Sequence, residues 1–207
     1  MGGIEESVGN HGWLPPMTLV DGEIWIVGGC WGSNTKTVEK YDSLRNQWAK
    51  MKSKNVECDG PVVICMQGSI YSLGGEEGSR KTNKVECFNL NTSTWSFISP
   101  MLNARSVPAA VEFQNRLYVL GGYSEGYLKT VEAYDPSSNS WTMFAPMISA
   151  RQLPNSFVFN GNIYAVGGYG SRKTMEKYDS EEKTWVTVDI PKDMNLDIME
   201  SVNIKAI

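Results

Sequence analysis

The residue types that most often carry catalysis or hold a metal ion are scarce in this sequence. It contains one histidine, His11, within a Gly-Asn-His-Gly stretch. A single imidazole cannot build a histidine-rich metal site, and the sequence places no acid or nucleophile beside it that would make it a general base. The sequence therefore predicts a protein that is not an enzyme, with no catalytic residue, no metal site and no cofactor. Catalysis by His11 is kept as an alternative.

The cysteines are the next candidates for chemistry, and their spacing indicates reduced thiols. Cys30, Cys58, Cys65 and Cys87 form no CxxC pair, and no Cys/His spacing typical of zinc is present. A disulfide scaffold of this size would usually carry more cysteines. The start, MGGIEESVGN, lacks the basic end and apolar run of a signal peptide. We therefore expect a cytoplasmic protein.

Four glutamates recur in equivalent places, each two residues before an aromatic side chain. They are Glu39, Glu86, Glu132 and Glu176. Four identical acids do not resemble a catalytic pair, whereas a hydrogen-bonded structural acid in every unit is a common demand of packing. Arg105 and Arg151 also repeat in register, and we expect them to pair with these glutamates.

The glutamates belong to a longer repeat of 46 or 47 residues that contains glycine pairs and tryptophans. An aromatic residue stands three positions before each glycine pair, and a tryptophan stands seven positions after the aromatic of each Glu-x-aromatic motif. The glycines are Gly28, Gly29, Gly74, Gly75, Gly121, Gly122, Gly167 and Gly168. The tryptophans are Trp48, Trp95, Trp141 and Trp185. Such recurrence indicates structural roles for both sets.

Each unit is predicted to form four short strands. In the third unit these are PAAVEFQ, RLYVLGG, TVEAYDP and SWTMFAP, rich in β-branched and aromatic residues and separated by turn residues. No segment sustains a helical period, so the fold is expected to be all-β. A four-stranded sheet that is apolar on both faces must stack on its neighbours, and radial stacking gives a β-propeller. The glycine pairs would allow close backbone approach, and the tryptophans would fill the space between sheets.

The pattern resembles the kelch repeat. The stretch from Tyr118 to Arg151 carries the aromatic before Gly-Gly, the Val-Glu-x-Tyr-Asp motif, and the tryptophan followed by Pro-Met and Arg. Departures are Phe88-Asn89 in the second unit, Met175 in the fourth, and Gly12 in the place of the arginine before the first. We also expect three extra residues in the segment 54–59 to break the register there.

The resemblance implies a single kelch-type β-propeller with four full four-stranded blades and a partial closing blade. The expected boundaries are 1–12 for a remnant of a partial blade, 13–59, 60–106, 107–152 and 153–193 for repeats 1 to 4, and 194–207 for a closing strand. A fragment of a larger kelch protein and a small ring are the two alternatives, and unclosed blade edges could pair with a second copy.

Function in such a fold is expected in the loops on one face, because the strands are committed to packing. A net charge of −4 argues against nucleic acid and anionic membranes as partners. The loops between second and third strands offer rigid aromatic side chains and hydrogen-bond donors for an acidic segment. The candidate partner-binding residues are Trp31, Arg80, Lys81, Tyr123, Tyr127, Tyr169, Arg172 and Lys173.

The predicted function is therefore a protein-protein interaction module that binds a partner protein or peptide. Similar kelch proteins are substrate adaptors of cullin-based ubiquitin ligases, which contact the ligase through a BTB domain that this chain lacks. Actin binding is the alternative among interaction roles, and an enzyme on a propeller scaffold is the alternative of another class.

Overall fold

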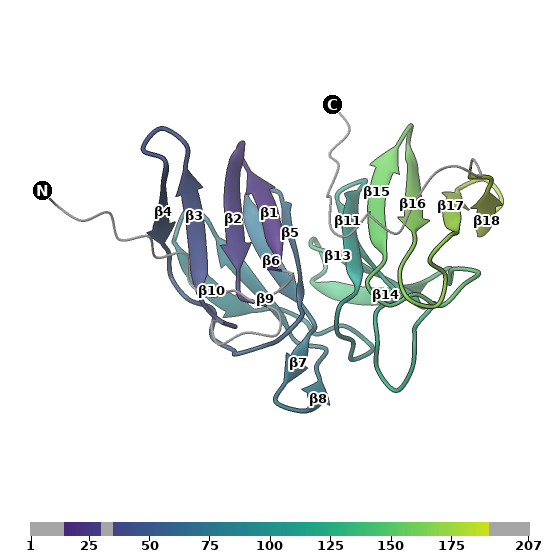
Figure 1. Ribbon diagram of the computed structural model, residues 1–207, viewed down its shortest axis with the longest axis horizontal. Coiled ribbons are helices and arrows are strands. Elements are labelled where there is room, and N and C mark those ends of the chain that lie inside the picture. The colour runs from purple at the N-terminus through teal and green to yellow at the C-terminus, as the bar shows by residue number, and fades with distance from the viewer. Residues whose placement is uncertain (1–14, 30–34, 191–207) are drawn as a thin grey trace, which may run out of the picture.

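The structure, a computed structural model, describes residues 15–29 and 35–190. These residues form strands, turns and loops (Figure 1). Within them, no helix is long and apolar enough to cross a membrane.

Sixteen of the strands make four antiparallel sheets of four strands, which we call blades 1 to 4. Blade 1 contains β1 (Met17–Val20), β2 (Glu23–Val27), β3 (Val38–Asp42) and β4 (Gln47–Lys50). Blade 2 contains β5 (Val62–Met66), β6 (Ser69–Leu73), β9 (Val85–Asn89) and β10 (Thr94–Phe97). Blade 3 contains β11 (Ala109–Phe113), β12 (Arg116–Leu120), β13 (Val131–Asp135) and β14 (Ser140–Phe144). Blade 4 contains β15 (Asn155–Phe159), β16 (Asn162–Val166), β17 (Met175–Asp179) and β18 (Thr184–Val188).

The strands form where the sequence predicts them, which confirms the all-β fold. In blade 3 each strand lies inside its expected segment, and the Glu-x-aromatic motif pairs with the tryptophan strand so that Tyr134 stands opposite Trp141. The tight turns that join β11 to β12 and β13 to β14 contain residues with positive φ, such as Asn115 at 60° and Asn139 at 48°. Asparagine tolerates this conformation better than most residues, so the turns end the strands at fixed points.

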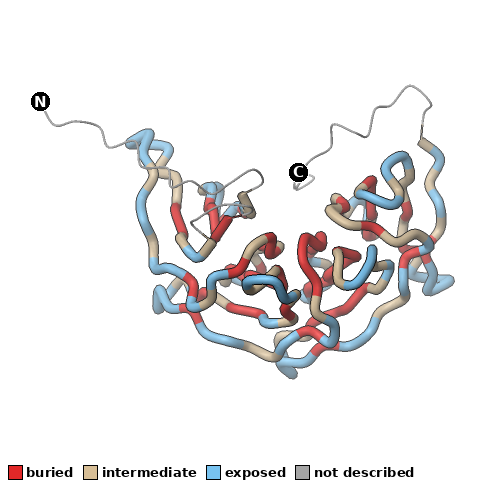
Figure 2. The backbone as a smooth tube through the Cα atoms, turned by 60° about the horizontal axis from the view of Figure 1, so that its bottom comes forward, coloured by how far each residue is buried: buried red, intermediate tan, exposed pale blue. Residues whose placement is uncertain are grey.

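The blades follow one another along an arc, with their first strands side by side. Strand β5 lies between β1 and β11, and β11 lies between β5 and β15. Figure 2 shows buried segments gathered within the arc, with blades 1 and 4 at its two ends. This arrangement confirms a kelch-type propeller architecture with four four-stranded blades.

The hydrophobic core lies between neighbouring blades. Trp95 packs in a cluster with blade 1 residues that include Trp25, while Trp141 and Trp185 occupy the equivalent clusters of the next two interfaces. Each of these three indoles also donates a 2.8 Å hydrogen bond to a carbonyl of the segment that leaves the preceding blade, at Lys52, Ser99 and Ala145. Apolar packing and one directed hydrogen bond therefore fix each blade to the blade before it.

The four sheets fall inside the expected ranges 13–59, 60–106, 107–152 and 153–193. The expected remnant of a partial blade at 1–12 and the expected closing strand at 194–207 lie outside the described residues.

Candidate functional site

The loops between second and third strands lie beside the segments that join consecutive blades. The backbones of Asp59 and Glu76 exchange two hydrogen bonds of 2.9 and 2.8 Å. Ser106 pairs in the same way with Tyr123, and Gln152 with Tyr169. These pairs bring both sets of loops to one edge of the blades, which we call the loop face. It comprises residues 76–81, 123–127 and 169–173 with the linkers 54–59, 103–107 and 150–153.

The linkers are also bonded to one another around the arc. The amide of Val107 donates to the carbonyl of Gly60 at 2.8 Å, and the amide of Leu153 donates to Val107 at 3.0 Å. Val107 and Leu153 hold positive φ angles of 45° and 52°. Valine, which is β-branched, and leucine both rarely adopt this conformation, so the surrounding bonds must stabilise it. The loop face therefore rests on a fixed backbone frame.

The glycine pairs allow the loops to approach these linkers. Gly121 and Gly122 have φ angles of 62° and 98°, which side chains rarely adopt. A Cβ atom on Gly122 would lie 2.8 Å from the carbonyl oxygen of Ser106, and one on Gly121 would lie 2.5 Å from that of Arg151. The pair therefore permits both the turn and the close backbone contact.

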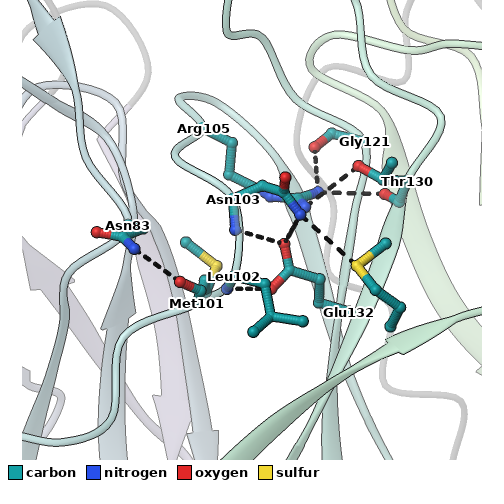
Figure 3. Close-up of polar contacts among 9 residues, drawn as sticks. Asn83, Met101, Leu102, Asn103, Arg105, Gly121, Thr130 and Glu132 are labelled. Atoms are coloured by element: carbon teal, nitrogen blue, oxygen red, sulfur yellow. Dashed lines mark hydrogen bonds and ion pairs between the residues drawn. The ribbon is translucent and has the colours of Figure 1, made fainter.

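A buried arginine anchors the linker that enters blade 3. The guanidinium of Arg105 donates to the carbonyls of Gly121 and Thr130 at 2.9 and 3.1 Å and forms an ion pair with Glu132 (Figure 3). Both charged side chains are fully buried. Burial lowers the pKa of Arg105, and the negative charge of Glu132 opposes that shift. The arginine stays charged because its ordinary pKa is so high.

Glu132 connects the same linker to the blade from the other side. Its carboxylate accepts hydrogen bonds from the backbone amides of Leu102 and Asn103 at 2.6 and 3.0 Å. Blade 4 repeats the arrangement, because Arg151 pairs with Glu176 at 2.8 Å and the amides of Ile148 and Ser149 donate to that carboxylate. The pairing expected for the repeated arginines and glutamates is therefore present in both blades.

The expectation that the segment 54–59 breaks the register is wrong. The amides of Asn55 and Val56 donate to Glu86, as the equivalent amides do in blades 3 and 4. Cys58 stands at the arginine position, and its thiol contacts the carbonyl of Gly74 at 3.0 Å. The segment therefore keeps its length, and the arginine has been exchanged for a cysteine.

A lysine supplies the buried cation in blade 2 from a different position. Lys54 stands where blades 3 and 4 have Met101 and Met147, and its ammonium group donates to the hydroxyl of Ser72 at 3.2 Å. Burial lowers the pKa of Lys54, and the negative charges of Glu86 and Glu77 oppose the shift. Burial also raises the pKa of the Cys58 thiol from 9.0 to about 11, which keeps it protonated and unreactive.

An aromatic and cationic cluster covers the part of the loop face formed by blades 2 and 3. Lys81 pairs with Glu76 at 2.5 Å and lies over the ring of Tyr123, 5.5 Å from its centroid. Tyr123 and Tyr127 meet edge to face at 6.1 Å. A Cβ atom on Gly170 would meet the Tyr127 ring at 2.8 Å, so the loops of blades 3 and 4 touch here. Cation-π and aromatic contacts thus hold these side chains in place.

The loop of blade 4 adds a second aromatic and cationic pair. Arg172 lies over the ring of Tyr169, 4.5 Å from its centroid. Tyr127 and Tyr169 are 47% and 40% exposed, so much of each ring faces solvent. Arg80 and Lys173 are exposed on the same face. Of the candidate partner-binding residues, only Trp31 lies outside the described residues.

Two features of the loop face were not expected from the sequence. Residues 76–81 form a small hairpin of β7 (Glu76–Glu77) and β8 (Arg80–Lys81), which projects from the lower edge of the blades in Figure 1. A shallow pocket of about 280 Å³ lies between a linker and a loop. Its lining residues are Asn103, Ala104, Ser124, Glu125, Gly126, Tyr127 and Leu128. The sequence identifies Tyr127 as a candidate binding residue, but nothing in it indicates that this loop and the linker at Asn103 enclose a pocket.

Within residues 15–29 and 35–190, no group of three or more histidine, cysteine, aspartate or glutamate side chains is placed to hold a metal ion. His11 and Cys30 lie outside the described residues. In the part of the chain that the structure describes, Cys58 and Cys87 are free thiols.

Comparison with known proteins agrees with the architecture. The profile of the KLHDC2/KLHL20/DRC7 Kelch-repeats domain matches residues 16–197. Kelch-like protein 35 of Mus musculus is 30% identical over 112 residues, which are 53% of this chain and 20% of that protein. Kelch-like protein 6 of Homo sapiens is 32% identical over 108 residues, 52% of this chain and 17% of that protein.

Kelch-like ECH-associated protein 1A of Danio rerio is 33% identical over 103 residues, which cover 48% of this chain and 17% of that protein. The matched part thus spans a fifth or less of the length of these three relatives. The domain profile, in contrast, spans all four blades. The chain belongs to the kelch-repeat family.

Proposed function

We propose that this chain is a protein-interaction module that binds an extended segment of a partner protein on its loop face. The observation that carries the proposal is a group of three tyrosines on loops that are bonded to a rigid backbone frame. Tyr127 and Tyr169 are exposed, and Tyr123 and Tyr169 each have a cation over the ring. Tyrosine and arginine are enriched among the residues that dominate binding energy at interfaces. A fixed aromatic surface also loses little conformational entropy on binding.

The charges of the loop face favour an acidic segment as the ligand. Glu76 and Glu77 are already paired with Lys81 and Lys84, at 2.5 and 2.8 Å. The exposed cations Arg80, Arg172 and Lys173 are opposed on this face by the exposed Glu125 and the half-buried Asp59. The exposed Glu57 pairs with Lys36 at 3.4 Å. A carboxylate of the partner would form charge-assisted hydrogen bonds with the exposed cations. The binding surface would then combine aromatic contact with local positive charge, although the whole chain is acidic.

The relatives support a role that depends on protein partners. The name of Kelch-like ECH-associated protein 1A describes that relative as associated with ECH. We propose, at a finer level, that this chain holds a substrate for a ubiquitin ligase, with actin filaments as the alternative partner. Both would use the same loop face, so the first experiment is designed to test the face and then to separate the two partners.

The experiment is quantitative affinity capture with the wild-type chain and a Tyr127→Ala, Tyr169→Ala double variant. Two interface tyrosines together are expected to lower the recovery of specific partners at least about tenfold, because each hot-spot residue is worth more than about 1 kcal/mol. The purified chain is then mixed with actin filaments and sedimented. Recovery of a ligase substrate without co-sedimentation supports the adaptor role.

The matched control is Leu44→Ala, Arg45→Ala, which removes an exposed apolar and an exposed charged side chain from the β3–β4 turn. Because the strands alternate in direction, this turn lies at the edge opposite the loop face. If the control loses the same partners as the tyrosine variant, or if the tyrosine variant keeps them, the loop face is not the binding site.

A further inference from the structure

Blade 1 exposes a surface that is buried in every other blade. Ile24 is 36% exposed, whereas its equivalents in blades 2, 3 and 4, which are Ile70, Leu117 and Ile163, are 0%, 0% and 1% exposed. The repeat therefore provides an internal control, because the same position is covered by a preceding blade in three cases and uncovered in one.

Other side chains on this side of blade 1 follow the same rule. Met17 is 43% exposed, while Val63 and Ala110 at the equivalent positions are 2% and 4% exposed. Trp48 is half-buried, whereas Trp95 is buried. We call this surface the first end face. It is formed by Met17, Leu19, Ile24, Tyr41 and Trp48.

Blade 4 exposes the complementary surface at the other end of the arc. Tyr164 is half-buried, whereas its equivalents Trp25, Tyr71 and Tyr118 are buried. Phe157 and Tyr164 stack on each other, with their ring centroids 5.1 Å apart and their planes 5° apart. We call this surface the second end face. It is formed by Phe157, Phe159, Tyr164 and Met175.

The internal interfaces show what covers surfaces of these two kinds. Between blades 1 and 2, Trp25 meets Phe88 with ring centroids 5.9 Å apart. Between blades 2 and 3, Tyr71 meets Tyr134 at 6.1 Å. Tyr164 of the second end face corresponds to the first ring of each pair, and Tyr41 of the first end face corresponds to the second ring. Each end face therefore carries one half of the interface that the chain builds internally.

We propose that two copies of this chain associate head to tail, with blade 4 of one copy packed against blade 1 of the other. The occupant is a second copy because both halves of the interface are present on one chain, while Figure 2 shows blades 1 and 4 apart at the two ends of the open arc. Large exposed apolar surfaces on soluble proteins mark sites of association. The loop face lies on a different edge, so self-association and partner binding are compatible.

The test is sedimentation velocity of the wild-type chain over a concentration series, together with two variants. The wild type is expected to move with concentration from the 23.0 kDa of one chain to at least twice that mass. Ile24→Asp breaks the first end face and Phe159→Asp breaks the second. Both replaced side chains are already partly exposed, so each variant should keep its fold and sediment as a monomer at every concentration.

Mixing the two variants distinguishes a head-to-tail contact from other modes of association. The Ile24→Asp chain retains its second end face and the Phe159→Asp chain retains its first. Their mixture should therefore form a one-to-one dimer and nothing larger. Leu44→Asp is the control, since it places the same charge on a turn residue that is 97% exposed, and it should associate like the wild type.

Two results would overturn the proposal. A wild-type chain that is monomeric throughout would mean that the end faces are covered within one copy, by its own residues. Association that survives in both single variants would place the contact elsewhere. In either case the tyrosine variants of the loop face still test the proposed function separately.

Discussion

The cation that anchors each linker to its blade is an arginine in blades 3 and 4 and a lysine in blade 2. In Arg105 and Arg151, Nη1 donates to the carbonyls of Gly121 and Gly167, respectively, and Nη2 pairs with a glutamate. In blade 2 the same space holds Lys54 and Cys58, with Ser72 facing the lysine. All three blades thus contain a buried positive charge at this place, although the lysine of blade 2 stands four residues before the arginine position.

This exchange predicts that the blade 2 residues depend on one another. Cys58→Arg alone adds a second buried cation beside Lys54, which we expect to lower the free energy of unfolding by about 3 kcal/mol. The triple change Lys54→Met, Cys58→Arg, Ser72→Val copies Met101, Arg105 and Val119 of blade 3 and should restore most of the loss. Urea unfolding of both variants measures the difference.

The Lys54→Met, Ser72→Val double variant is the control for this comparison, because it removes the lysine without supplying the arginine and leaves Glu86 uncompensated. It should be less stable than the triple variant. A triple variant that is no more stable than Cys58→Arg alone would show that the three positions do not act together.

At this scale the sequence predicts the Arg–Glu pairs but not the lysine. Arg105 and Glu132 repeat in register in two blades, so their pairing follows from the pattern. Lys54 occupies a methionine position, and only the folded backbone shows that its ammonium group reaches the space vacated at Cys58. Because the lysine stands at a different position of the repeat from the arginines, the repeat pattern in the sequence does not reveal that it takes their place.

The elements themselves are largely determined by the repeat. The strands of blade 3 match their expected segments because β-branched and aromatic runs end at turn residues on both sides. The β7–β8 hairpin was not predicted, since it has only two residues in each strand and no apolar alternation. Its pairing is stabilised by the Glu76–Lys81 ion pair and the contact of Lys81 with Tyr123, which join different elements.

The glycine pairs lead to a prediction about the stability of variants in the loops that follow the second strands. Gly122→Ala would hold alanine at a φ of 98° and press its Cβ on the carbonyl of Ser106, so we expect a loss of about 1–3 kcal/mol or more in the free energy of unfolding. Gly126→Ala, four residues along the same loop, has nothing within 4 Å and should change stability little. Thermal and urea unfolding of the two variants test this. Equal losses would contradict the role of close approach.

The whole molecule is a series of sheets in which each blade contacts mainly its neighbours. Proteins built in this way distribute their stability over the interfaces between successive units, so the units at the ends are the least supported. Blade 2 is covered on both sides by large buried side chains, whereas blade 1 is covered on one. The protection of backbone amides from hydrogen exchange should therefore be lower in blade 1 than in blade 2.

Hydrogen exchange tests this directly. In dilute solution, the backbone amides of β3 and β4 in blade 1 should exchange faster than those of β9 and β10 or of β13 and β14, which have the same strand pairing but lie against a preceding blade. If copies associate head to tail, the difference should shrink as the concentration rises. Equal protection of the three strand pairs in dilute solution would contradict the view that neighbouring blades supply it.

The tryptophan hydrogen bonds have a consequence for how the chain is made. The indole of Trp95 bonds to the carbonyl of Lys52, 43 residues earlier, and those of Trp141 and Trp185 bond 42 and 40 residues back. Each bond joins the last strand of one blade to the segment that leaves the blade before it. During synthesis on a ribosome, the segment that leaves one blade can therefore form its hydrogen bond only after nearly all of the next blade has emerged. The interfaces between blades would then form one after another, in the order in which the blades are synthesised.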